Sequence, residues 1–74
     1  MTRLPVCSGA QAVAAFQSAG WRRDRQRGSH VTLAKPGSPV VLTVPLHDEL
    51  GPGLLRALIR KAGLSVEEFS DLLR

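Results

Sequence analysis

The sequence predicts a small α+β fold in which one helix is followed by three antiparallel strands and then by two more helices. Three observations indicate this order. Two patterns of serine followed three residues later by Gln or Glu mark helix starts. Apolar residues recur with helical spacing after each of them. Between them, a Pro-Gly turn joins two segments of alternating apolar and polar residues. The 74 residues allow one domain, which we expect to span residues 1–74.

The first helix is expected at about residues 9–19. Ser8 and Gln11 form a capping box, in which each side chain accepts a hydrogen bond from the backbone amide of the other residue. Apolar residues at positions 12, 13, 16 and 19 form one stripe along this helix. Gly20 ends it, because glycine adopts the left-handed conformation without steric cost.

Three strands are expected next, at about residues 21–26, 30–34 and 39–45. Arg27-Gly28-Ser29 forms the first turn, and Lys35-Pro36-Gly37-Ser38 fits a type II turn. With Lys35 opposite Ser38, three cross-strand pairs follow: Val31–Leu42, Leu33–Val40 and His30–Thr43. Alternation then directs the valines and leucines of these pairs toward the core and leaves His30 on the opposite face of the sheet.

The second helix is expected to begin near Gly51-Pro52, since proline suits the first helical position, and to end at Gly63. Its apolar face consists of Leu54, Leu55, Leu58, Ile59 and Ala62, and Leu64 folds back onto Ile59. A second capping box, Ser65 with Glu68, starts the third helix, from which Phe69, Leu72 and Leu73 pack inward. An α-β-β-β-α core of this kind is the arrangement of the double-stranded-RNA-binding domain, here with one further helix. Fold alone does not define function.

Basic charge is concentrated in the first half of the chain. Residues 1–35 carry six Lys or Arg residues against Asp24 alone, whereas residues 36–74 carry four against five acidic residues. Such a segment favours a polyanionic partner, because neutralised phosphates release counterions from the nucleic acid. A solvated, arginine-rich edge strand that resists aggregation explains the charge equally well.

Several protein classes are not expected. No apolar run approaches the roughly 18–20 residues that cross a bilayer, and the first residues lack the apolar stretch of a signal peptide. A single cysteine, Cys7, forms no internal disulfide and does not predict a structural zinc site; we interpret it as a small apolar residue. We therefore expect a cytoplasmic protein without membrane association, metal or small-molecule cofactor.

His30 is the strongest candidate for chemistry. Metal-free cleavage of RNA requires a group that removes the 2′-hydroxyl proton or protonates the leaving 5′-oxygen. An imidazole suits either role, because its unperturbed pKa of about 6.5 lies near cellular pH. Nearby arginines would stabilise the charge that develops on phosphorus. Spacing alone, however, favours an ordinary surface histidine on a strand.

Other residues are candidates for supporting roles. Gly28-Ser29 offers a backbone amide and a hydroxyl to a phosphate, or is a simple turn. Strict alternation places Arg23, Arg25 and Arg27 on one face with Trp21, and Arg22 with Asp24 on the other, which leaves their roles open. His47 follows the last strand, roughly 13 Å beyond the predicted partner of His30 if that strand runs straight, which favours a loop residue.

In order and spacing, a set of short motifs resembles the HicA (YcfA-like) family of bacterial toxins over essentially the whole chain. The motifs are Leu4-Pro5 before Ser8-Gly9, Ala19-Gly20-Trp21, Arg25-Gln26-Arg27-Gly28-Ser29-His30, Val44-Pro45, His47, Glu49-Leu50, Pro52-Gly53, Leu55-Arg56 and Ala62-Gly63-Leu64-Ser65. The resemblance implies a double-stranded-RNA-binding-like fold and the toxin of a type II toxin–antitoxin system, an mRNA interferase that arrests growth. It also implies a HicB antitoxin as partner and His30 as the catalytic histidine. The second histidine that often follows the Gly-Ser-His motif is Val31 here.

Together, these observations predict a metal-independent endoribonuclease that cleaves mRNA to a 2′,3′-cyclic phosphate and a 5′-hydroxyl. His30 is the expected catalytic residue, and the expected RNA contacts are Arg23, Arg25, Arg27, Gly28, Ser29 and His47. We expect the antitoxin to cover His30. Two alternatives stay open: a non-catalytic RNA-binding module of the same fold, and an inactive family member that binds only the antitoxin.

Overall fold

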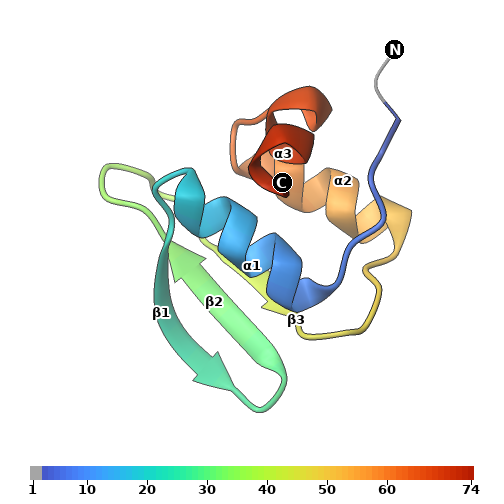
Figure 1. The fold of residues 1–74 in the computed structure, drawn as a ribbon. Helices are drawn as coiled ribbons and strands as arrows, with labels where there is room; N and C mark the ends of the chain where they lie inside the picture. The colour runs from blue at the N-terminus through green and yellow to red at the C-terminus, as the bar shows by residue number, and fades with distance from the viewer. Residues whose placement is uncertain (1–2) are drawn as a thin grey trace.

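A computed structural model describes residues 3–74 of the chain. The elements are α1 (Gly9–Ser18), β1 (Arg22–Arg27), β2 (His30–Ala34), β3 (Leu42–Pro45), α2 (Pro52–Lys61) and α3 (Val66–Leu72). The strands form one antiparallel sheet in the order β1-β2-β3. Helix α1 crosses one face of the sheet, and α2 and α3 lie beside α1 (Figure 1). The predicted α+β fold class is therefore confirmed.

Local hydrogen bonds define the ends of the helices where the sequence places them. At the start of α1, the Gln11 N–H donates to Ser8 Oγ (3.1 Å) and the Ser8 N–H donates to Gln11 Oε1 (2.8 Å). The start of α3 repeats this capping box with Ser65 and Glu68. At the end of α2, the N–H groups of residues 63 and 64 donate to the carbonyls of residues 60 and 59, which is a Schellman motif.

The register between β2 and β3 differs from the predicted one by two residues. Val31 pairs with Val44, Leu33 pairs with Leu42, and His30 pairs with Pro45 rather than with Thr43. Because the difference is an even number, every side chain of the pair keeps its predicted face. The predicted division of β2 and β3 into a core face and an open face is therefore confirmed, although the predicted pairs are wrong.

The connection between β2 and β3 explains the changed register. The expected turn is present, since the Ser38 N–H donates to the Lys35 carbonyl (3.0 Å). Pro39 has no N–H to give to a ladder, and the Val40 N–H donates to Ser38 Oγ (3.3 Å) instead of to β2. β3 consequently starts at Leu42 rather than at residue 39. Val40 is 37% exposed, so its predicted place in the core, opposite Leu33, is wrong.

The core lies between the sheet and the helices. Its largest fully buried side chains are Phe16, Phe69, Leu33, Leu42, Leu55, Val31 and Val44. The rings of Phe16 and Phe69 lie 5.0 Å apart between centroids and join α1 to α3. The apolar face of α2 is narrower than expected, because Leu54 is 40% exposed and only Leu55, Leu58 and Ile59 are buried. Leu72 and Leu73 of the last helical turn pack against this core while remaining partly exposed.

Gly9 brings the start of α1 into direct contact with the chain that follows β3. Its N–H donates to the His47 carbonyl (2.9 Å). A Cβ at this position would overlap the carbonyl oxygen of Pro45 and would lie 2.8 Å from the Cα of Leu46. Only a glycine permits this close approach of two backbones. It holds the segment that carries His47 against the helix.

Candidate nucleic-acid interface

A β-bulge in β1 decides which arginines share a face with His30. Arg23 pairs with Leu33 and Arg25 pairs with Thr32, so Asp24 has no cross-strand partner. Directly paired residues of antiparallel strands point to the same side of the sheet. Arg23 therefore points to the helix-covered side, as the buried Leu33 does, whereas Arg25 points to the open side.

Beyond the bulge, Arg27 pairs with His30 and shares the open side with Arg25. Before the bulge, Arg22 pairs with Ala34 and also lies on the open side. The sequence-based expectation that Arg23, Arg25 and Arg27 share one face with Trp21 is therefore wrong. It assumed strict alternation, which the unpaired Asp24 interrupts.

Hydrogen bonds confirm where Arg23 lies. Its Nη1 donates to Gln26 Oε1 (2.9 Å), and Gln26 pairs with the buried Val31. Gln26 in turn donates from Nε2 to the carbonyl of Gly28 (3.0 Å). Of the three arginines expected to contact RNA, the structure brings Arg25 and Arg27 together with His30 and leaves Arg23 on the other side of the strand.

His30 is exposed and stands at the tip of the β1–β2 hairpin. Gly28 has a φ of 58° and Ser29 does not have a positive φ, which is the pattern of a type II′ hairpin turn. Both turn residues are exposed, and the Ser29 carbonyl accepts a hydrogen bond from the Leu46 N–H (2.6 Å). This bond continues the pairing of β2 with β3 beyond His30. The backbone of His30 is therefore held between β1 and the chain that follows β3.

His47 lies fewer residues beyond the strand partner of His30 than the sequence predicts. The observed register places it two residues beyond Pro45, the partner of His30, which is a distance of about 7 Å along an extended strand. His47 is exposed and lies just outside β3, and its backbone carbonyl accepts the hydrogen bond from the Gly9 N–H at the start of α1. The predicted separation of roughly 13 Å was an error of register.

The site also contains residues that the sequence analysis did not single out for RNA. Arg22, Thr32 and Thr43 lie on the open side, and all three follow from the bulge and the register. One signal was present in the sequence: Asp24 stands within an otherwise basic strand, and Asp is disfavoured in regular strands.

The part of the chain that matches a known protein family includes all three strands of the sheet. Residues 9–64 match the family described as HicA toxin of bacterial toxin-antitoxin. The chain belongs to the HicA family. The match runs from the first residue of α1 to the residue after the C-terminal turn of α2, so it includes the sheet, His30 and His47. No curated protein matches the chain. As the toxin of a toxin–antitoxin pair, this HicA chain has an antitoxin as its partner.

The open face of this HicA toxin is cationic. The side chains that the register assigns to it are neutral or basic: Arg22, Arg25, Arg27, His30, Thr32, Ala34, Thr43 and Pro45. Among residues 3–74, no group of three His, Cys, Asp or Glu side chains is placed to hold a metal ion. The helices of the described residues are too short or too polar to span a membrane.

The cysteine of the HicA chain lies in the core and not on the open face. Cys7 is buried beside α1, and burial raises the pKa of its thiol. A protonated thiol is a poor nucleophile, which agrees with the interpretation of Cys7 as a small core residue.

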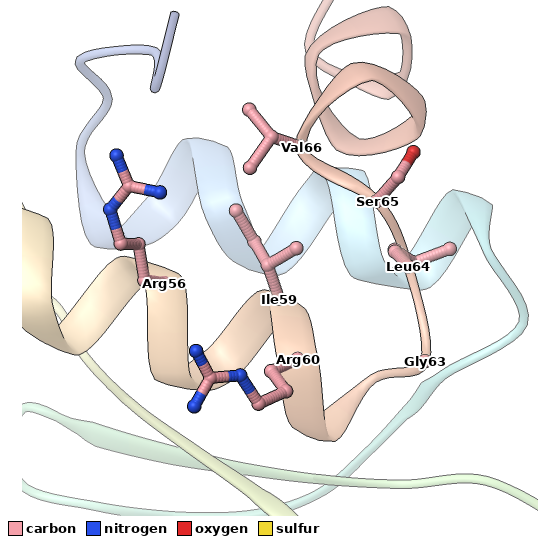
Figure 2. Close-up of a pocket in the computed structure, with 7 residues that line it drawn as sticks. All are labelled: Arg56, Ile59, Arg60, Gly63, Leu64, Ser65 and Val66. Carbon is pink, nitrogen blue, oxygen red and sulfur yellow. The ribbon is translucent and has the colours of Figure 1, made fainter. Parts of the chain in front are cut away.

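A separate concavity lies on the helical side of the HicA fold, between the end of α2 and the start of α3 (Figure 2). Ile59, Leu64 and Val66 form its apolar part, and Arg56 and Arg60 project from α2 beside them. It has no residue in common with the open face of the sheet, so we do not include it in the interface.

Proposed function

We propose that this HicA toxin is a metal-independent endoribonuclease that cleaves mRNA, with His30 as its general acid or base. One observation carries the proposal: an exposed histidine is paired with an arginine on the sheet face that the helices leave uncovered. An imidazole transfers protons near neutral pH, and a guanidinium binds phosphate. A phosphodiester lying on this face can meet both groups at once.

The proposed reaction needs only proton transfers. The ribose 2′-oxygen attacks the adjacent phosphorus and forms a bond to it, while the bond from phosphorus to the 5′-oxygen breaks. The 2′-hydroxyl gives up its proton, and the leaving 5′-oxygen gains one. The products are a 2′,3′-cyclic phosphate and a 5′-hydroxyl. His30 makes one of these two transfers, and Arg25 and Arg27 stabilise the negative charge of the five-coordinate phosphorus.

We assign the RNA contacts to the residues that surround His30. Arg25 and Arg27 share its face, Gly28 and Ser29 form the exposed turn before it, and His47 follows its partner strand. We leave Arg23 out of this set, because it points to the other side of β1 and is bonded to Gln26. Its predicted contact with RNA stays a sequence-based expectation.

The proposed antitoxin is of the HicB kind and inhibits the toxin by covering the open face. His30, Arg25 and Arg27 are all exposed, so access to them is most simply blocked by a bound partner. Freed from the antitoxin in the cytoplasm, the toxin would degrade mRNA and arrest growth in response to stress. A complex with the antitoxin that leaves His30 accessible to solvent would contradict this mode of inhibition.

The deciding experiment compares the intact chain with a His30→Ala variant, in the presence of a chelator. We expect the intact chain to cleave mRNA and to leave 2′,3′-cyclic phosphate ends. The variant should bind RNA, fail to cleave it and no longer arrest growth. Unchanged cleavage by the variant would remove His30 from the mechanism. Binding without cleavage by the intact chain would instead favour an RNA-binding module, and neither activity would favour an inactive, antitoxin-binding protein.

A further inference from the structure

The bulge places three arginines at equal intervals along the open side of β1. Arg22, Arg25 and Arg27 pair with residues 34, 32 and 30 of β2, which are alternate residues of a regular strand. Alternate residues lie about 6.6 Å apart, so the two intervals of the row together measure about 13 Å. We propose that these arginines form a phosphate track, which holds single-stranded RNA along β1 and presents the following phosphodiester to His30. This inference rests on the proposed function and specifies its substrate.

The bulge is what makes such a row compatible with the core. Trp21 immediately precedes β1 and is only 3% exposed, so the chain enters the strand with this side chain directed inward. In a regular strand the same inward face would carry Arg23, Arg25 and Arg27. The extra residue, Asp24, reverses the alternation after Arg23 and directs Arg25 and Arg27 outward. The fold thereby buries the tryptophan and keeps a continuous basic row.

The dimensions of the row suit an extended RNA backbone. An interval of about 7 Å is close to the spacing of successive phosphates in an extended single strand. All three arginines are exposed, so each guanidinium is free to form paired hydrogen bonds with a phosphate. The row ends at Arg27, the direct partner of His30. A strand bound to all three positions therefore continues onto the imidazole.

The rest of the fold indicates recognition through the backbone and not through the bases. The aromatic residues of the chain are Phe16, Trp21 and Phe69, and all three are buried in the core. The open face consequently has no Phe, Tyr or Trp side chain on which a base could stack. In-line attack by a 2′-oxygen also needs a flexible linkage, which a single strand provides more readily than a stacked duplex. We therefore infer that the track binds single strands with little preference for base.

The salt dependence of RNA binding measures how many phosphates the track neutralises. For single strands, log Kobs falls with log salt concentration by about 0.7 for each phosphate that the protein neutralises. The probe is a fluorescein-labelled 2′-O-methyl oligouridylate, which lacks the attacking hydroxyl and cannot be cleaved. Its binding to the full chain is followed by fluorescence anisotropy from about 25 to 200 mM salt. Each of R22A, R25A and R27A should reduce the slope by about 0.7, and the triple variant should reduce it by about 2.

Two control variants distinguish RNA binding by the phosphate track from a general effect of the protein's net charge. Arg60→Ala removes the same charge from an exposed position on α2, which is not part of the sheet, and should leave the slope unchanged. Arg23→Ala removes a charge next to Arg22 but from the opposite side of β1, so it should reduce the slope much less than R22A does. Circular dichroism checks that each variant is folded. Equal effects of R23A and R22A, or of R60A and R25A, would overturn the track, as would the absence of binding by the unmodified chain.

The experiments distinguish a failure of the phosphate track from a failure of the proposed cleavage reaction. If His30→Ala abolishes cleavage of RNA while the three variants keep the full slope, the nuclease proposal stands and the track is wrong. If the slopes fall as expected while His30→Ala still cleaves, the track stands and the assignment of His30 is wrong.

Discussion

Replacement of Gly9 by alanine tests the contact that joins the first helix to the segment after β3. The added Cβ would overlap the Pro45 carbonyl oxygen and crowd the Leu46 Cα. Both neighbours are backbone atoms, so no side-chain rotation relieves the overlap and one of the two chains has to shift. The shift also strains the hydrogen bond from the Gly9 N–H to the His47 carbonyl (2.9 Å).

The size of the effect follows from three contributions. Overpacking of a well-packed site costs about 1–3 kcal/mol. A weakened backbone hydrogen bond adds about 0.5–1.5 kcal/mol. Alanine is favoured over glycine in a helix by up to about 1 kcal/mol, which offsets part of this cost. We expect Gly9→Ala to lower the free energy of unfolding by about 2 kcal/mol, a large part of the roughly 4–11 kcal/mol typical of a domain this size.

The assay is urea unfolding followed by the fluorescence of Trp21, which is buried in the native state. With a slope near 1 kcal/mol per M for a small domain, the midpoint should fall by about 2 M. Gly53→Ala is the matched control, because Gly53 lies in the first turn of α2 and a Cβ there would meet nothing within 4 Å. It should be neutral or stabilising by up to about 1 kcal/mol. An unchanged or higher midpoint for Gly9→Ala would refute the close approach.

Three further predictions concern the core and the titratable groups. Leu55→Ala should cost about 2–5 kcal/mol in urea unfolding, whereas Leu54→Ala should cost much less because Leu54 is 40% exposed; equal losses would contradict the observed face of α2. The buried Cys7 thiol, whose pKa is raised by burial, should react with a thiol reagent in the unfolded chain and resist it in the native one. Hydrogen bonds from the backbone N–H and hydroxyl of Ser65 lower the pKa of Glu68 below its ordinary value of 4.5. The stabilisation by ionised Glu68 is therefore present above pH 4.5 and is lost as the pH falls through the lower folded-state pKa. The stability advantage of the native chain over Glu68→Gln should shrink over that range, and a constant difference would contradict the assignment.

The helices were predictable because their determinants are local. Each capping box joins residues three apart in the chain, so Ser8 with Gln11 and Ser65 with Glu68 are visible in the sequence. The Schellman motif after α2 likewise needs only Gly63 and its neighbours. The faces of β2 and β3 follow from simple alternation.

The register and the bulge were not predictable by the same reasoning, because they depend on pairing between strands. The turn at Lys35–Ser38 forms as its sequence indicates, yet Pro39 and the Ser38 hydroxyl delay the start of β3 by three residues. The bulge at Asp24 allows Trp21 to be buried while Arg25 and Arg27 stay in solvent. The sequence of the strand alone does not show how much each of these two contributions stabilises the fold. As a result, the face of the sheet on which His30 lies was predictable, but the set of arginines that shares this face was not.

The composition of β1 also affects how copies of the toxin behave toward one another. β1 is an edge strand, and each of its six residues is exposed and charged or polar. A second copy that extended the sheet along this edge would bring arginine against arginine across the new pair, and like charges directly opposite one another are destabilising. The same residues that attract a polyanion therefore discourage the sheets of two toxin molecules from joining along this edge.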